Sequence, residues 1–209
     1  MTVFLPDPAY DPNAAPFIDS ETKLGPETSM ATFLGSYGNR CSLDFIPDQE
    51  TRRSIARYLY LHAEVIRQFN QLKEFADYRL IVAESLSPNV EGGYAWPEDN
   101  PEDGSASPSN FSKNQGYAVV YQLVDQSGNI AHNKTFDLAS FWRDYIMFDF
   151  IFLDYDTYNP DGTLTSSIVL YVPTLTDALY TMDTPKSLCE TLFNGDWIDV
   201  NNLREVLPA

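Results

Sequence analysis

Residues 47–75, with the sequence PDQETRRSIARYLYLHAEVIRQFNQLKEF, decide the fold because they predict one long and largely buried helix. Apolar side chains recur there at steps of three and four residues, which places them on one face of a helix. The members of this stripe are Ile55, Leu59, His62, Ile66 and Phe69. Asp48 is the predicted N-cap, and Glu50 adds negative charge to the first turn, where it suits the helix dipole. His62 is expected to be a structural residue at the edge of the core rather than a metal ligand.

Short segments rich in β-branched and aromatic residues follow this helix. They predict strands at residues 78–83, 117–124, 148–155 and 167–172. Residues 125–129 form a turn signal, so we expect a hairpin that continues into residues 130–136. Asp137 is the predicted N-cap of a short helix over residues 138–147. Together these elements predict an α+β fold, in which a small antiparallel sheet packs with the long helix.

The pattern divides the chain into three parts. Residues 1–40 contain repeated prolines between single apolar residues, so we expect an extended arm that docks on its own domain or on a neighbouring subunit. Residues 41–175 form the α+β domain, and residues 176–209 form a helical or extended C-terminal appendage. The residues expected to contact a partner are Phe4, Leu5, Tyr10, Phe17, Ile18, Tyr94 and Trp96.

Charge and composition exclude several classes of protein. The chain has 13 Lys and Arg against 30 Asp and Glu, a net charge of -17, which excludes a basic nucleic-acid-binding protein. Apolar residues make up 44%, too many for a disordered acidic chain. No stretch has the roughly 20 apolar residues of a membrane span. Cys41 and Cys189 are far apart, so two reduced thiols are expected.

Two acidic segments allow more than one interpretation. Residues 85–112 read as a long acidic loop, which is either a solvated surface or, through Tyr94 and Trp96, a partner contact. Oxygen-bearing side chains at Asp154, Asp156, Asn159 and Asp161 suggest calcium, but their spacing is not that of an EF-hand and an ordinary turn accounts for them.

The order of several segments resembles the zinc D-alanyl-D-alanine carboxypeptidases and related peptidoglycan peptidases, especially the small forms of bacteriophages. Residues 42–47, SLDFIP, precede the long helix, and residues 81–88, IVAESLSP, stand in place of the family's S-G-Y-R-S-P motif. Residues 111–120, FSKNQGYAVV, align with S-x-H-x-x-G-x-A-x-D, so that Gly116 and Ala118 match. Residues 148–154 are similar to F-D-x-x-x-x-E, and residues 167–169 align with W-x-H.

The resemblance implies a peptidase-like domain that has lost its metal ligands. Lys113, Val120 and Val169 stand at the three ligand positions, Asp154 at the general-base position, and Leu86 at that of a substrate-binding arginine. Valine offers no lone pair and an ammonium group repels the ion, so neither zinc nor another cofactor is expected and no catalytic residue is assigned.

The first interpretation is therefore a non-catalytic structural or interaction protein of a bacteriophage virion, in its tail, baseplate, neck or capsid surface. It would be made in the host cytoplasm, would be present in several copies, and would contact other virion proteins through the arm and the acidic loop. Direct contacts with nucleic acid or membrane are not expected.

The alternative is an active peptidoglycan-cleaving zinc peptidase with an atypical metal site. His62, His132, Asp125 or Asp137 would supply its ligands, and Asp125 and His132 would face each other across the hairpin turn. A third possibility, an acidic protein that mimics DNA or inhibits a host enzyme, depends on charge alone.

Overall fold

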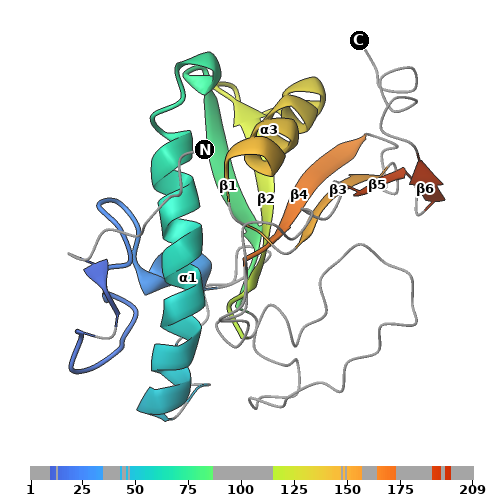
Figure 1. Cartoon of the computed structure of the whole chain (residues 1–209). Coiled ribbons are helices and arrows are strands. Elements are labelled where there is room, and N and C mark those ends of the chain that lie inside the picture. The colour runs from blue at the N-terminus through green and yellow to red at the C-terminus, as the bar shows by residue number, and fades with distance from the viewer. Residues whose placement is uncertain are drawn as a thin grey trace.

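The fold is described from a computed structural model (Figure 1). The structure describes residues 10–12, 14–34, 43, 46, 48–86, 115–146, 148, 150–156, 164–172, 190–193 and 196–198. Two helices lie against one face of a twisted sheet, and the N-terminal segment wraps around the longer helix.

The sheet has six strands in the order β1-β2-β4-β3-β5-β6. Their bounds are β1 Tyr78–Glu84, β2 Ala118–Asp125, β3 Phe150–Asp156, β4 Thr165–Tyr171, β5 Glu190–Phe193 and β6 Asp196–Ile198. The first four strands in this order are antiparallel, which confirms the predicted α+β fold and antiparallel sheet. β5 then joins β3 in parallel, and β6 pairs with β5 in antiparallel orientation. Within the segment predicted as a C-terminal appendage, residues 190–193 and 196–198 therefore extend the sheet itself.

The long helix α1 spans Gln49–Phe69 and begins as predicted. The carboxylate of Asp48 accepts a hydrogen bond from the backbone N of Thr51 at 2.8 Å, and hydrogen bonds from Thr51 hold the pKa of Asp48 below its ordinary value. The helix ends at Phe69 rather than Phe75, because a turn separates it from the short 3₁₀ helix η4 at Lys73–Phe75.

The chain enters β2 through Gly116, which lies against α1. The φ angle of Gly116 is +82°, and a Cβ atom at this position would lie only 2.9 Å from the carbonyl oxygen of Ile55. A side chain here would therefore force the helix away from the sheet.

The predicted hairpin strand at residues 130–136 is wrong. Ile130 forms only an isolated bridge with Val124, and the chain then enters helix α3 at His132–Tyr145. The buried residues of α3 are Thr135, Leu138, Ala139 and Trp142, and this spacing of three and four is that of a helix. Packing of this face on the sheet outweighs the strand preference of the local β-branched and aromatic residues. Asp137, the predicted N-cap, lies inside the helix.

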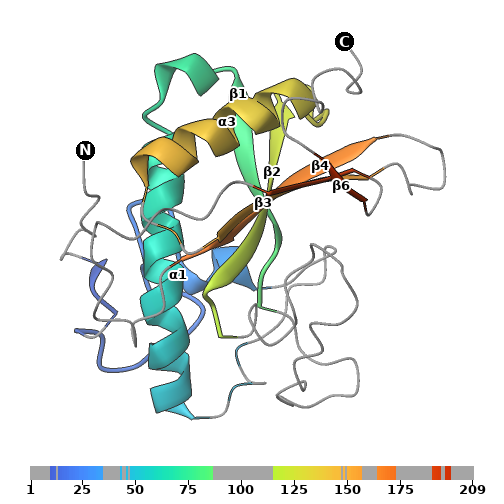
Figure 2. The same cartoon turned by 45° about the vertical axis from the view of Figure 1, so that its right-hand side comes forward.

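Both helices cover the same face of the sheet (Figure 2). The rings of Tyr121 on β2 and Trp142 on α3 meet edge to face, with their centroids 5.4 Å apart. From the other side, His62 of α1 approaches Tyr121. Tyr121 is therefore the side chain at which the sheet and both helices meet.

The N-terminal segment contributes to this core. Ile18, Leu24, Met30 and Phe33 are fully buried, the last two in the 3₁₀ helix η2 at Met30–Phe33. Leu34 forms a parallel bridge with Leu86 at the end of β1. The described residues of the predicted arm thus dock on their own domain, the first of the two alternatives. Ile18 was predicted to contact a partner, and this is wrong because its side chain is enclosed by its own chain.

Two neighbouring residues test whether the N-terminal segment is part of the folding unit. We expect Ile18→Ala to lower the free energy of unfolding by about 2–4 kcal/mol, because it leaves a cavity in the core. Phe17→Ala should change it by less than about 0.5 kcal/mol, because the Phe17 side chain is 57% exposed. Urea denaturation followed by circular dichroism measures both, and equal small effects would show that the segment is not part of the core.

Candidate functional site

Two positions to which the resemblance assigns zinc ligands are adjacent in the sheet. Val120 of β2 and Val169 of β4 are directly opposite each other in the antiparallel pair, and their side chains are only 6% and 1% exposed. They lie on the face opposite the helices, since their strand neighbours Tyr121 and Ile168 belong to the core beneath α1 and α3. Hydrocarbon side chains have no lone pairs, so this pair cannot ligate a metal ion.

The predicted general-base position lies on the same face. Asp154 of β3 is half-buried and opposite Ser167, two residues along from the pair formed by Phe152 and Val169. Two strand residues span about 7 Å and bring the side chain back to the same face. The structure therefore brings Asp154, Val120 and Val169 together on one face, whereas Lys113 lies outside the described residues.

The position assigned to a substrate-binding arginine is also apolar and enclosed. Leu86 is fully buried, and its backbone N donates a hydrogen bond to the carbonyl oxygen of Phe33 at 3.1 Å. This residue holds the N-terminal segment against the end of β1.

His62 has a structural role, but it lies inside the core rather than at the predicted edge, because its side chain is fully buried. Its Nδ1 lies 2.9 Å from the hydroxyl of Tyr121, and its Nε2 lies 3.2 Å from the carbonyl oxygen of Tyr117. Because the carbonyl can only accept, Nε2 carries the proton and donates to Tyr117, while Nδ1 accepts from Tyr121. Both ring nitrogens are therefore used to join α1 to β2.

Burial is the main cause of the pKa shifts of both His62 and Tyr121. It lowers the pKa of His62 from 6.5 to about 3, although the hydrogen bond to Tyr117 opposes the shift. Burial also raises the pKa of Tyr121 well above its usual range. Both groups are therefore neutral near pH 7.

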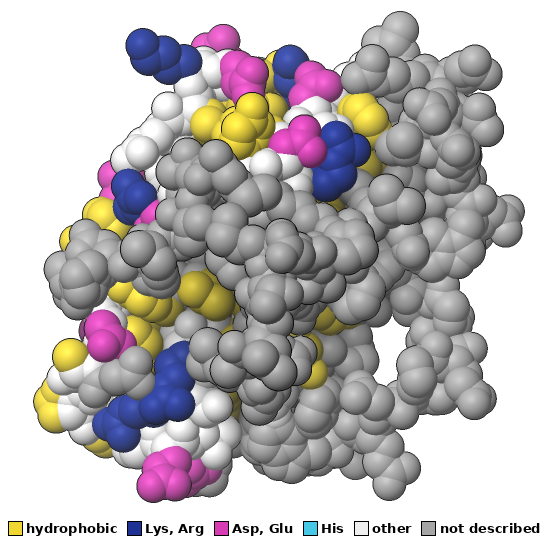
Figure 3. Space-filling view, viewed as in Figure 1, with side chains coloured by type: hydrophobic (Ala, Val, Ile, Leu, Met, Phe, Trp, Pro, Cys, Tyr) yellow, Lys and Arg dark blue, Asp and Glu magenta, His cyan; other side chains and the backbone are white. Residues whose placement is uncertain are grey.

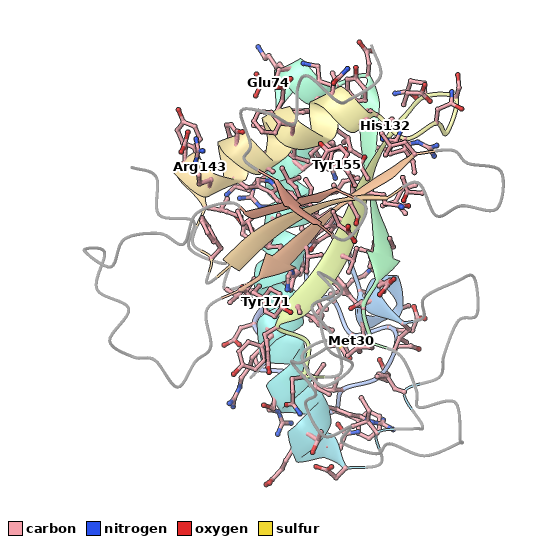
Figure 4. All side chains as sticks on the ribbon, turned by 90° about the vertical axis from the view of Figure 1, so that its right-hand side faces the viewer. Met30, Glu74, His132, Arg143, Tyr155 and Tyr171 are labelled. Atoms are coloured by element: carbon pink, nitrogen blue, oxygen red, sulfur yellow. The ribbon has the colours of Figure 1, made fainter. Side chains whose placement is uncertain are left out.

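The second histidine, His132, anchors the start of α3 to the sheet (Figure 4). Its Nδ1 lies 3.0 Å from the hydroxyl of Ser166 on β4, and its carbonyl oxygen accepts a hydrogen bond from the hydroxyl of Tyr155 at 3.0 Å. Thr135 lies 3.3 Å from the same Ser166 hydroxyl. Ser166 is fully buried, whereas His132 is half-buried.

The carboxylates considered for an atypical metal site have other partners. Asp125 accepts hydrogen bonds from the backbone N of Ser127 and of Asn129, both at 2.8 Å, and from the Asn129 amide. The hydrogen bonds from Asn129 are the main reason why the pKa of Asp125 is lowered. Asp137 forms an ion pair of 2.9 Å with Lys134. Asp125 thus shapes the turn after β2 and Asp137 pairs along α3, so His132 and Asp125 have different partners.

Within the described ranges, no group of three or more His, Cys, Asp or Glu side chains is arranged to hold a metal ion. Cys41, Cys189, Asn159 and Asp161 fall outside those ranges, as do the side chain of Asp156 and most of the acidic loop.

An arginine clamp at the start of α1 is the main polar feature that sequence reasoning missed. The guanidinium of Arg52 is buried and donates to the carbonyl oxygens of Ile18, Leu43 and Ile46. Gln49 exchanges two hydrogen bonds with the backbone of Ile18, at 2.8 Å and 3.2 Å. One helix turn therefore fixes two separate preceding segments.

Arg53 extends this clamp by donating to the carbonyl oxygens of Ala15 and Pro16, at 3.1 Å and 3.4 Å. Lys and Arg side chains gather on the visible surface near this end of α1 (Figure 3). Positive charge in the first turns of a helix is unfavourable because it opposes the helix dipole. Two arginines at this place in the sequence could therefore have indicated that they have specific acceptors.

The remaining predicted partner residues fall into two groups. Phe17 is exposed and Tyr10 is half-buried. Phe4, Leu5, Tyr94 and Trp96 lie outside the described residues, so their role stays a prediction.

The buried imidazole predicts an acid-sensitive stability. Below pH 6.5 His62 binds a proton in the unfolded chain, but in the folded chain it does so only near pH 3. Stability is therefore lost as pH falls through this interval, by about 5 kcal/mol in total. We expect the difference in unfolding free energy between the natural chain and His62→Gln to shrink over the same interval.

His132→Gln is the control, because His132 is partly exposed and should contribute a smaller pH dependence. The chain has only two histidines, so NMR titration of the imidazole signals gives the two pKa values directly. An ordinary pKa for His62 would contradict the buried hydrogen bonds.

Arg52→Lys tests the clamp, because an ammonium group cannot reach three carbonyl oxygens in the geometry of a guanidinium. We expect the free energy of unfolding to fall by about 2–4 kcal/mol as buried carbonyl groups lose their donors. Arg57→Lys, at an exposed position of the same helix, should change it by less than about 0.5 kcal/mol. Chemical denaturation measures both, and equal effects would show that Arg52 is not a specific clamp.

No protein-family model, no curated protein and no solved structure matches this chain. In the part of the chain that the structure describes, no helix is both long and apolar enough to cross a membrane.

Proposed function

We propose that this chain is a non-catalytic structural protein of a bacteriophage virion, which contacts other virion proteins through its N-terminal arm and acidic loop. The observation that carries the non-catalytic part is the pairing of Val120 with Val169 in the sheet. The virion part of the proposal is supported by the resemblance to phage-type peptidoglycan peptidases.

The pairing of Val120 with Val169 supports a structural role, rather than a catalytic one, for this part of the sheet. A zinc site needs imidazole, carboxylate or thiolate ligands around an accessible ion. Here two hydrocarbon side chains occupy adjacent ligand positions, and both are buried. Without such ligands the chain cannot lower the pKa of a bound water at this place, and amide hydrolysis lacks its nucleophile.

The N-terminal segment supports a role in protein contacts. The backbone on both sides of Phe17 is held, since Arg53 binds the carbonyl of Pro16 and Gln49 binds the backbone of Ile18. The aromatic side chain between them is 57% exposed. A large apolar group on a fixed backbone loses little entropy on binding, which suits it to be an anchor in an interface.

The charge of the chain favours a basic partner surface. A net charge of -17 gives long-range attraction toward positive patches and steers their approach. The tail, the baseplate, the neck and the capsid surface are the proposed locations, with several copies assembled from protein made in the host cytoplasm.

The first experiment is quantitative mass spectrometry of purified particles of the bacteriophage that encodes the chain. We expect the chain in every preparation, in a constant ratio to a known capsid protein, and a phage enzyme that is not packaged serves as the negative control. Absence of the chain from the particles would refute the virion proposal.

Phe17→Ser tests the anchor within the same particle. We expect a folded protein with reduced incorporation, because the substitution removes exposed apolar surface without touching the core. Tyr145→Ser, which removes another exposed aromatic side chain from the end of α3, is the matched control. Equal incorporation of both variants would show that Phe17 is not an anchor. Deletion of residues 1–40 is unsuitable because it removes Ile18 and Phe33 from the core.

Metal content and peptidoglycan hydrolysis distinguish the scaffold from the alternative enzyme. We expect the full-length chain, after incubation with zinc and dialysis, to retain far less than one zinc ion per chain and to release no fragments from peptidoglycan. Stoichiometric zinc with hydrolysis that is lost in His132→Ala would establish the peptidase instead.

A further inference from the structure

Residues 78–84 of β1 have an outer edge along which no described strand pairs, and the bridge between Leu34 and Leu86 lies two residues beyond the end of this strand. The strand order places β1 at one end of the sheet, with β2 as its partner on the inner side. Its pale green ribbon forms a rim of the sheet in Figure 4. None of its seven side chains is buried, in contrast to the mostly buried side chains of β2. Such an edge presents backbone N–H and C=O groups to any strand that can lie beside it.

A bulge in β1 places two opposite charges on one face. Arg79, Ile81 and Glu84 pair with Val124, Gln122 and Val120 of β2, which are alternate residues and therefore share a face. In a regular strand, residues 79 and 84 would point to opposite faces. The irregularity between Val82 and Glu84 adds one residue, Ala83, and returns Glu84 to the face of Arg79.

We propose that two copies of this chain associate through antiparallel pairing of their β1 edges, around a two-fold axis at Ile81. With the bulge residue set aside, Arg79 and Glu84 lie two pairing positions on either side of Ile81. The two-fold axis therefore places Arg79 of each copy opposite Glu84 of the other. Ile81 then faces its own equivalent, and Leu80 faces Val82 on the opposite side of the sheet.

The side chains of the edge suit this pairing. Ile81 is 40% exposed and is one of the few large apolar side chains exposed among the described residues. Charged side chains usually prevent edge-to-edge association, but these two have opposite signs at equal distances from the axis, so they attract across it. An isologous contact of this kind closes after two copies and continues the sheet from one into the other.

Such a dimer does not require a role in a virion, but it must form against the repulsion between two acidic chains. Each copy carries a net charge of -17, so long-range repulsion opposes association at low ionic strength. At about 0.15 M salt the screening length is about 8 Å, which weakens that repulsion more than it weakens close pairs. Association should therefore be measured at this ionic strength or above.

Sedimentation velocity over a concentration series detects the association, and hydrogen exchange locates it. We expect the full-length chain to form dimers as its concentration rises, with amides of residues 78–84 gaining protection in parallel. A chain that stays monomeric up to about 1 mM would overturn the proposal. Dimers that leave these amides unchanged would overturn it as well.

Variants that reverse the charge of Arg79 or of Glu84 test the proposed register directly. Arg79→Glu places like charges at both ends of the paired edge, and so does Glu84→Arg, so each variant alone should dimerise at least about tenfold more weakly. A mixture of the two variants restores an Arg and Glu pair at both ends, and we expect heterodimers with near-natural affinity. Glu84 also interacts within its own chain, so the mixture is the more informative measurement.

Ile81→Lys and Tyr145→Ser complete the set. Ile81→Lys places two positive charges on the axis and should abolish dimerisation, whereas Tyr145→Ser, at an exposed site outside the sheet, should leave it unchanged. Circular dichroism and thermal melting verify that each variant is folded. Natural affinity in Arg79→Glu, or no heterodimer in the mixture, would show that β1 does not pair in this register.

Discussion

The N-terminal half of the structure depends on the hydrogen bonds that the buried guanidinium of Arg52 donates. This group is held near the start of α1 and donates to carbonyl groups at Ile18, Leu43 and Ile46, which come from two separate segments. Buried carbonyl groups without donors are costly, so these segments need a donor that reaches several of them at once. A proline-rich segment with few regular hydrogen bonds of its own becomes part of the core in this way.

Similar polar contacts join the other layers of the molecule. His62 links α1 to β2 through Tyr121 and Tyr117, and His132 links α3 to β4 through Ser166. These side chains are of the types that enzymes use for catalysis, but here their atoms are engaged in holding elements together. The groups available for contact with other molecules lie instead at the surface, at Phe17 and along the edge of β1.

Features determined by neighbouring residues were predictable from the sequence, and features determined by distant contacts were not. Asp48 was identified as a cap because a cap needs only the residues that follow it, and the four principal strands were located by their β-forming residues. The start of α3 was missed, because Thr135 and Phe136 favour a strand until Leu138 and Trp142 can pack on the sheet.

The features of the candidate site that the sequence did not predict also depend on contacts between distant residues. The adjacency of Val120 and Val169 depends on the pairing of β2 with β4, which no local pattern encodes. The burial of Ile18 and the acceptors of Arg52 likewise depend on where the N-terminal segment folds back. The parallel pairing of β5 with β3 joins strands separated by β4 and the segment that follows it.

The strand order also determines when the interior can close during synthesis. β4 lies between β2 and β3 but is made after both, so the centre of the sheet is incomplete until residue 171 has left the ribosome. Ile18 and Phe33 belong to the same core cluster as Ile168 and Leu170 of β4. At about 5–20 residues per second, the apolar N-terminal side chains wait on the order of ten seconds for the complete surface that encloses them. The nascent chain therefore exposes these apolar N-terminal side chains until β4 has been made.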